Sequence, residues 1–248
     1  MGTDIESTLK SFSQIGLFSH NPYNGIGLWL EEQELLLTLV GESKKYLEIG
    51  SHNLGSALLV ERHAKTNEIN REVFAVDLQF SPWAQLNYSR AKSDLTQIQC
   101  NSNDILSYEK DLAGVDFVFI DGYHSFSQVI NDFNAAEKLM TNGGIIAFHD
   151  TSPYLNKEEH RKKCLEFAKN NFHELITSEE EDFYVDEAIC FLVDQYQKKS
   201  NVRINWIDCT LECYHPRETR LNGWIRGKTS PHSAIWALQI QKGNTYEG

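Results

Sequence analysis

Short apolar runs alternate with amphipathic stretches through the first two thirds of the chain. The runs are rich in β-branched and aromatic residues, which is typical of strands. We expect strands at 45–49, 72–77, 96–100, 115–120 and 144–149. Between them, apolar residues recur at three- and four-residue spacing, which indicates amphipathic helices. The clearest of these helices are expected at 29–40 and 126–140, the second ended by the Asn-Gly-Gly run at 142–144.

The alternation of strands and helices predicts an α/β fold with a doubly wound, mostly parallel sheet. After position 150 we expect two more helices and then two late strands with a long loop between them. These helices are placed at 157–170 and 184–198, and the strands at 202–208 and 234–240. The late strands would extend the sheet to seven strands, with an antiparallel terminal strand at its edge. Ligands of such sheets bind at the carboxyl ends of the strands.

The length of 248 residues fits one domain covering 1–248. Within it, 1–40 is expected to form a helical lead-in and 151–232 to carry insertions that recognise an acceptor molecule. Hydrophobic residues make up 41% and aromatic residues 11% of the chain, which is ordinary for a globular protein.

The acidic surface restricts the class of partner. The formal net charge is -12, and no basic stripe is present to attract a phosphate backbone, so we expect no nucleic-acid partner. No apolar run approaches the roughly 20 residues of a membrane span, and the first residues do not have the layout of a signal peptide. Five scattered cysteines suit free thiols in the cytoplasm. A zinc cluster of Cys209, Cys213 and His215 lacks an evident fourth ligand.

The first expected strand ends in a loop that contains two glycines and opens a helix. The loop includes Glu48, Gly50, Ser51, Gly55 and Ser56, in the pattern E-x-G-x-x-x-x-G rather than the dinucleotide pattern G-x-G-x-x-G. An acidic residue two positions before the first glycine would repel a phosphate group but suits a ligand that carries an ammonium and a sulfonium. A plain strand-to-helix turn remains an alternative interpretation of this loop.

Two further strand ends carry polar residues in an order that suits an adenosine. Asp77 ends the second strand, 22 residues past Gly55, and is followed by Leu78. A carboxylate at this position can accept both ribose hydroxyls. Asn103 and Asp104, just past the third strand, suit an adenine edge. Each feature alone is also compatible with a helix cap or a turn, and their correct order is the stronger signal.

The fourth and fifth strands end in candidate metal ligands. Asp121 ends the fourth strand, and His149 and Asp150 end the fifth. Adjacent parallel strands lie about 4.8 Å apart, so these side chains can converge. Two carboxylates and an imidazole suit Mg²⁺ or another divalent cation. The alternative is a pair of polar strand ends that are hydrogen-bonded to loops.

Three residues are candidates for the chemistry itself. His124 follows Asp121 by three residues, and its ordinary pKa of about 6.5 suits a general base. A packing or capping role for His124 is equally compatible with the sequence. Asp121 and His149 complete the set of candidate catalytic residues.

The run from 27 to 150 resembles the class I S-adenosylmethionine (SAM)-dependent methyltransferases, and most of all the branch of macrocin O-methyltransferase and related small-molecule enzymes. The resemblance lies in GLWLEEQELL (27–36), YLEIGSHNLGS (46–56), VFAVD (73–77), DFVFIDGYHSFSQVINDF (116–133) and GGIIAFHD (143–150). Many relatives have Lys-Ser-Thr where this chain has Gly55-Ser56-Ala57, and the region after about 155 resembles no family that we can place.

The resemblance implies a Rossmann-like methyltransferase fold with SAM as cofactor. It places Glu48 and Gly50 at the methionine end of SAM and Asp77 at the ribose. It places Asn103 and Asp104 beside the adenine, and Asp121 at the floor of the site. In metal-assisted O-methyltransferases, acidic or amide ligands stand at the ends of the fourth and fifth strands.

Together these features predict an O-methyltransferase that acts on a small molecule, such as a sugar or a phenolic metabolite, with or without a divalent metal. Metal-independent N-methylation on the same fold is one alternative. A nicotinamide-dependent oxidoreductase and a non-catalytic SAM-binding protein are two more. Assembly into a homo-oligomer is left open by the sequence.

Overall fold

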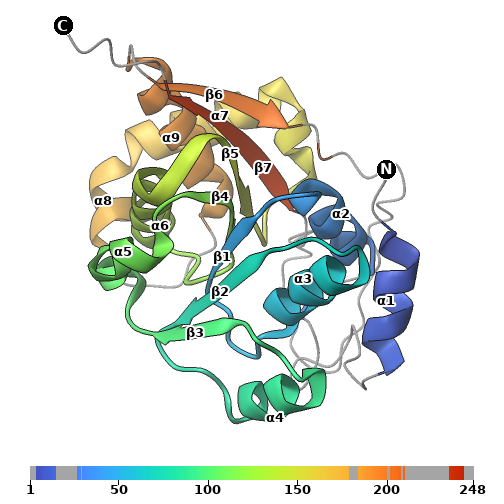
Figure 1. The fold of residues 1–248 in the computed structure, drawn as a ribbon. Helices are drawn as coiled ribbons and strands as arrows, with labels where there is room; N and C mark the ends of the chain where they lie inside the picture. The colour runs from blue at the N-terminus through green and yellow to red at the C-terminus, as the bar shows by residue number, and fades with distance from the viewer. Residues whose placement is uncertain are drawn as a thin grey trace, which may run out of the picture.

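The computed structural model describes residues 4–14, 27–28, 30–178, 184–199, 202–207, 209 and 235–242. Its centre is a seven-stranded sheet in the order β3-β2-β1-β4-β5-β7-β6 (Figure 1). The strands are β1 (Lys45–Ile49), β2 (Glu72–Asp77), β3 (Thr96–Gln99), β4 (Val115–Ile120), β5 (Met140–Phe148), β6 (Val202–Ile207) and β7 (Trp236–Lys242).

Strand direction follows the predicted pattern. The neighbours among β1 to β5 pair in parallel, whereas β7 pairs antiparallel with both β5 and β6. The predicted doubly wound, seven-stranded sheet with an antiparallel terminal strand is therefore confirmed, although this strand, β7, lies between β5 and β6 and not at the sheet edge. The bounds predicted for β1, β2 and β4 are those that the structure has.

Helices cover both faces of this sheet. They are α1 (Ile5–Gln14), α2 (Leu30–Val40), α3 (Gly55–Thr66), α4 (Pro82–Ala91), α5 (Glu109–Leu112), α6 (Phe126–Leu139), α7 (Glu158–Asn170), α8 (Phe172–Thr177) and α9 (Val185–Gln197), with 3-10 turns η1 (Ser102–Tyr108) and η2 (Pro153–Asn156). Helices α1 to α3 lie to the right of the sheet in Figure 1, and α6, α8 and α9 lie to its left. Among the described residues, no helix is both long enough and apolar enough to cross a membrane.

The boundary between α6 and β5 differs from the prediction. Helix α6 ends at Leu139, and Met140 already pairs with Val115 on β4. The Asn-Gly-Gly run at 142–144 therefore lies inside β5, and its interpretation as the end of the helix was wrong. The β4–β5 register shifts beside this run, and Gly143 has a φ of 84°. A glycine inside a strand pattern often marks such an irregularity.

The late part of the chain agrees with the sequence in most of its elements. Helices α7 and α9 and strands β6 and β7 lie where helices and strands were expected, whereas the short helix α8 was not anticipated. The predicted loop between β6 and β7 lies outside the described residues, apart from position 209, and so do Cys213 and His215.

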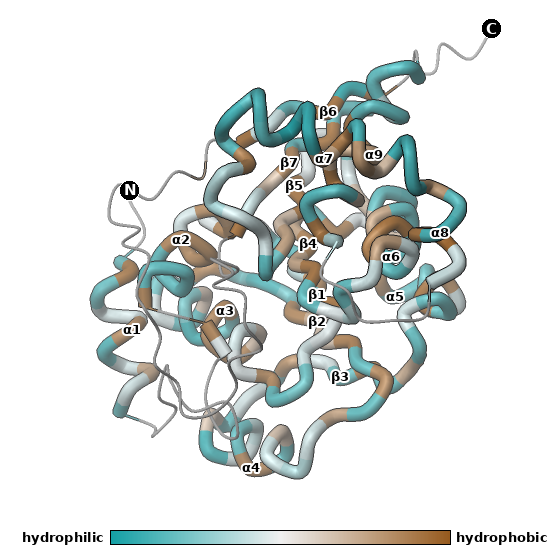
Figure 2. Tube along the Cα trace, turned by 180° about the vertical axis from the view of Figure 1, so that it is seen from behind, coloured by the Kyte–Doolittle hydropathy of each residue, from teal (hydrophilic) through white to brown (hydrophobic). Residues whose placement is uncertain are grey.

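Aromatic packing joins the sheet to the helices on one face. The ring of Phe133 on α6 stacks on Phe148 of β5, with ring centroids 6.2 Å apart, and meets the Tyr196 ring of α9 edge-on at 5.2 Å. All three side chains are buried. Figure 2 shows the central strands β4 and β5 largely hydrophobic and the outward turns of the surrounding helices largely hydrophilic. This packing fixes α6 and α9 beside the ends of β4 and β5.

Gly50 allows the close approach of β1 to β4 at the carboxyl edge of the sheet. Its φ of 93° lies in the region that favours glycine. A Cβ added at this position would overlap the backbone carbonyl of Asp121 and the Cα of Gly122. The turn after β1 can therefore lie directly against the turn after β4 only because this residue has no side chain.

Gly50→Ala is expected to lower the free energy of unfolding more than Gly143→Ala does. Gly143 also has a positive φ, but an added Cβ there would meet nothing within 4 Å. The control should therefore show only the backbone penalty of about 1–2 kcal/mol. Gly50→Ala adds a clash with backbone atoms that cannot move aside. Urea denaturation of both variants tests this, and equal losses would contradict the argument.

Candidate active site

The turn after β1 is held against the end of β2. The amides of Gly50 and Ser51 both donate to the Val76 carbonyl, at 2.9 and 3.2 Å. The Asp77 carboxylate accepts the His52 amide at 2.7 Å and the Gln79 amide at 2.9 Å. The structure thus brings Asp77 and the predicted glycine loop together at one edge of the sheet.

Glu48 lies beneath this loop and is completely buried. One carboxylate oxygen accepts the Tyr46 hydroxyl at 2.6 Å, and the other accepts the Ser56 hydroxyl at 2.8 Å. Burial raises the pKa of Glu48 to about 7, although both hydroxyl donors favour the ionised form. Tyr46 was not predicted as a site residue. Its position two residues before Glu48, on the same face of the strand, is a signal that the sequence offered.

Exposed groups form the outer part of the same edge. Leu78 follows Asp77 and is 67% exposed. Asn103 lies in the first turn of η1, where the Asn101 side chain caps its amide at 3.0 Å. Asp104 follows it in the same turn and is exposed.

Gln128 links η1 to α6 and was missed in the sequence analysis. Its Nε2 donates to the Ser102 hydroxyl at 2.9 Å and to the Asn103 side-chain oxygen at 3.3 Å. It also donates to the buried Asp132 carboxylate at 2.7 Å, and burial raises the pKa of Asp132 to about 6. A glutamine on an amphipathic helix gives no sequence signal for such a role.

Asp121, His124 and Asp150 converge at the ends of β4 and β5. One possible ligand atom from each lies within 4.8 Å of the others. The His124 Nε2 lies 3.6 Å from a carboxylate oxygen of Asp121 and 3.5 Å from one of Asp150. Asp150 has a φ of 53°, which turns the chain sharply at the end of the strand. The three residues form a compact set of one nitrogen and two carboxylate ligands.

His149 lies beside these three residues and is paired with carboxylates on both sides. Its Nδ1 is 2.9 Å from Asp121, and its Nε2 is 3.5 Å from Glu32 of α2. Burial alone would lower the pKa of His149, but the carboxylates of Asp121 and Asp150 raise it well above its ordinary value. Glu32 was not recognised as a site residue from the sequence.

The carboxylates of this cluster respond to the imidazoles in different ways. Burial opposes ionisation of Asp121, but His149 and His124 bring its pKa down to about 2. Burial and the Asp121 charge raise the pKa of Asp150. The pKa of His124 is also raised, because Asp121 and Asp150 outweigh the effect of burial. This half-buried edge therefore holds carboxylates and imidazoles whose charges strongly influence one another.

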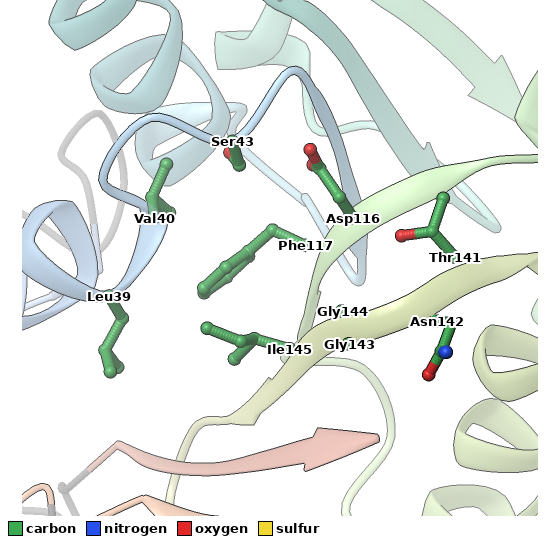
Figure 3. A pocket seen from close by; sticks show the side chains of 10 residues that line it. All are labelled: Leu39, Val40, Ser43, Asp116, Phe117, Thr141, Asn142, Gly143, Gly144 and Ile145. Atoms are coloured by element: carbon green, nitrogen blue, oxygen red, sulfur yellow. The ribbon is translucent and has the colours of Figure 1, made fainter. Parts of the chain in front are cut away.

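A cavity of about 250 Å³ lies at the opposite end of the strands. Its lining includes Ser43, Asp116 and Phe117, with Asn142 and Ile145 from the start of β5 (Figure 3). None of the predicted site residues lines this cavity. It belongs to the amino-terminal edge of the sheet and not to the candidate site.

Comparison with known proteins finds similarity to methyltransferases over part of the chain. A family model described as a methyltransferase domain matches residues 47–151. An uncharacterized protein of Acanthamoeba polyphaga mimivirus is 28% identical over 132 residues, which are 49% of this chain. The match spans 58% of that protein's length.

Solved structures share the fold at low sequence identity. An O-methyltransferase from Bacillus cereus, solved with SAH, has a TM-score of 0.55 and 15% identity, with 96% of this chain and 90% of that chain covered. The O-methyltransferase TomG from Streptomyces achromogenes, involved in tomaymycin synthesis and solved with SAM, has a TM-score of 0.55 and 16% identity, with 96% and 89% covered. At such identities the likeness establishes the Rossmann-like methyltransferase fold.

Glu48 is expected to make stability depend on pH. The folded carboxyl, with a pKa of about 7, keeps a proton that an unfolded glutamate loses above a pKa of about 4.3. The unfolding free energy of the wild type should therefore fall by about 3 kcal/mol, relative to Glu48→Gln, as the pH rises from about 5 to 8.

Urea denaturation at both pH values measures this difference. Glu72→Gln is the matched control, because the Glu72 side chain on neighbouring β2 is 67% exposed, and it should follow the wild type. Parallel pH profiles for the wild type and Glu48→Gln would show that the Glu48 carboxyl does not hold the proton.

Proposed function

We propose that this chain is a class I SAM-dependent methyltransferase that transfers the methyl group of SAM to a hydroxyl of a small-molecule acceptor with the help of a divalent cation; the family model and the shared fold support this proposal. The observation that carries the proposal is the meeting of two features at one sheet edge. One is the loop after β1, to which Glu48 and Asp77 are hydrogen-bonded. The other is the cluster of Asp121, His124 and Asp150. The Bacillus and Streptomyces O-methyltransferases of the same fold hold SAH and SAM respectively.

Asp77 is the proposed ribose ligand. Each of its carboxylate oxygens accepts one backbone amide, and a carboxylate oxygen has a second lone pair for a further donor. The exposed Leu78 supplies an apolar surface for the adenine ring. Asn103 and Asp104 supply polar groups for the adenine edge, and Gln128 orients the Asn103 side chain.

The loop after β1 is the proposed binding site for the methionine end. Gly50, Ser51, Gly55 and Ser56 bring the backbone close to the ligand, and Asp121 forms the floor. Glu48 lies under this loop, and the ammonium and sulfonium groups of a bound SAM would favour its ionised form. Its hydrogen bond from Ser56 fixes the first turn of α3 at the same time.

Asp121, His124 and Asp150 fit a divalent cation, because hard oxygen ligands and one imidazole suit such ions. Bound there, the cation would lower the pKa of an acceptor hydroxyl. We assign His149 a positioning role instead, because its ring faces Asp121 and Glu32. Alternatively, His124 acts from the same position as the general base that removes the acceptor proton. The rest of catalysis is in-line alignment of acceptor and methyl group.

The acceptor is expected to contact the region 151–232, whose described part includes η2 and α7 to α9. Tyr154 is 46% exposed, close in sequence to Asp150. The sequence-based expectations of a cytoplasmic protein without a nucleic-acid partner stay predictions. The choice between a monomer and a homo-oligomer also stays open.

Asp77→Asn is expected to weaken SAM binding by about 10- to 100-fold, since hydrogen bonds to a charged group are worth about 1.5–3 kcal/mol. Isothermal titration calorimetry with SAM measures the effect. Asp116→Asn is the matched control, because the Asp116 carboxylate also accepts two backbone amides, at 2.8 and 3.0 Å, but at the opposite edge of the sheet. Equal affinities of the two variants would contradict the ribose assignment.

Asp150→Asn is expected to reduce metal-stimulated methyl transfer by about 100-fold or more, because a bound cation supplies several kcal/mol. SAM affinity should be unchanged. Asparagine tolerates the positive φ of Asp150, so the backbone is preserved. The assay follows radiolabelled methyl transfer from SAM to a panel of catechols and sugars, with Mg²⁺ or Mn²⁺ or with a chelator.

Two results of this assay would count against the proposal. Wild-type turnover that is unaffected by the chelator would overturn the role of the metal. Absence of SAM binding in calorimetry, together with absence of methyl transfer to the whole panel, would overturn the proposed activity.

A further inference from the structure

A second group of metal-binding side chains lies away from the candidate active site, between α7 and α9. His160 and Cys164 are four residues apart on α7, and Asp186 and Cys190 are four residues apart on α9. Residues at this spacing lie on one face of a helix, one turn apart. Each helix therefore presents a pair of ligands to the other.

Three of these side chains, those of His160, Cys164 and Asp186, are in direct contact. The His160 Nε2 lies 2.8 Å from an Asp186 carboxylate oxygen and 3.5 Å from the Cys164 sulfur. One ligand atom from each of these three residues lies within 4.8 Å of the others. The Cys190 thiol neighbours Cys164, which contributes to raising its pKa, but it is not among the three atoms that meet this distance. Cys164, Asp186 and Cys190 are buried, and the His160 side chain is 30% exposed.

We propose that His160, Cys164, Asp186 and Cys190 bind one structural Zn²⁺ ion that clamps α7 to α9. Two sulfurs, one imidazole nitrogen and one carboxylate oxygen match the ligands that zinc takes in closed, tetrahedral sites. The two thiols favour zinc over Mg²⁺ or Ca²⁺, which prefer oxygen ligands. Binding would release the two thiol protons, because the ligands are thiolates.

A backbone group already orients one of the proposed ligands. The second oxygen of Asp186 accepts the Ser152 amide at 2.9 Å, which leaves the first oxygen directed at His160. Metal ligands in proteins are commonly held by such outer hydrogen bonds. Ser152 lies two residues after Asp150, so the same contact joins the zinc site to the turn after β5.

The first residues of α9 are tied to the turn after β4 as well. The Tyr184 amide donates to the His124 carbonyl at 3.3 Å. A metal between α7 and α9 would therefore fix the helix start that touches both turns of the candidate active site. The inference itself does not depend on the methyl-transfer proposal, because it rests on different side chains.

Metal analysis of the full chain tests the inference. The purified, reduced protein is incubated with Zn²⁺, passed over a desalting column and analysed by mass spectrometry for metal and protein. We expect one Zn²⁺ per chain. Replacement by Co²⁺ should give the thiolate-to-cobalt charge-transfer band and the visible spectrum of a tetrahedral ion.

Substitutions test whether zinc binding depends on these four residues and not on other residues of the chain. Cys164→Ser should lower Zn²⁺ affinity by more than about 100-fold, since loss of an outer hydrogen bond alone costs 10- to 100-fold. Cys100→Ser, at a cysteine outside the group, and Asp150→Asn, in the candidate active site, should keep one tightly bound Zn²⁺. His160→Ala and His160→Cys form a pair at the most exposed ligand, where only the cysteine variant should retain zinc.

Several outcomes would overturn the inference. They are a wild-type protein without stoichiometric Zn²⁺ after incubation, a cobalt derivative without the thiolate band, and a Cys164→Ser variant with unchanged affinity. A Cys164–Cys190 disulfide that persists in the reduced protein, detected by mass spectrometry, would overturn it as well. The methyl-transfer assay is a separate measurement, so either proposal can fail without the other.

Discussion

The pairing of the half-buried Asp121 with the buried His149 joins the ends of β4 and β5, and the rest of the candidate site is arranged around it. The Asp121 amide donates to the Ile49 carbonyl and the His149 amide to the Ile120 carbonyl, so both side chains start from fixed backbone. Glu32 closes the other side of the imidazole. Loss of one partner of a buried pair leaves an uncompensated charge, which typically costs 3–5 kcal/mol. The pairing therefore holds α2, β4 and β5 together as well as shaping the site.

This arrangement also explains why a positively charged ligand suits the edge. Glu32, Asp121, Asp150 and Glu48 gather there from three strands and one helix, and His149 and His124 are the imidazoles that face them. In a buried region such an excess of carboxylates is reduced by protonation or by binding of a cation. The raised pKa values of Glu48 and Asp150 favour protonation of these two carboxylates. Binding of a sulfonium compound or of a divalent ion would reduce the same excess of carboxylate charge.

The sequence predicted the features that depend on local pattern. The bounds of β1, β2 and β4 follow from continuous apolar runs between polar turns, and Asp77 and Asp121 follow from the rule that ligands lie at strand ends. Contacts between distant elements could not be predicted in this way. Nothing in the spacing of Glu32 and His149 indicates that they meet, because the packing of α2 decides it. The pairing of α7 with α9 likewise depends on how both helices dock on the sheet.

Backbone conformation gives the carboxyl edge a further property. His52, Leu54 and Asp150 have φ values of 32°, 64° and 53°, in a region that costs residues with side chains about 1–2 kcal/mol each. At the exposed His52 and the half-buried Asp150, glycine would relax the chain and remove a side chain from the edge. Leu54 is fully buried, so glycine there would leave a cavity that costs more than the strain. Random variation that selects only for heat resistance would thus favour changes that erode this surface. Thermal robustness and the proposed chemistry are therefore expected to compete at His52 and Asp150.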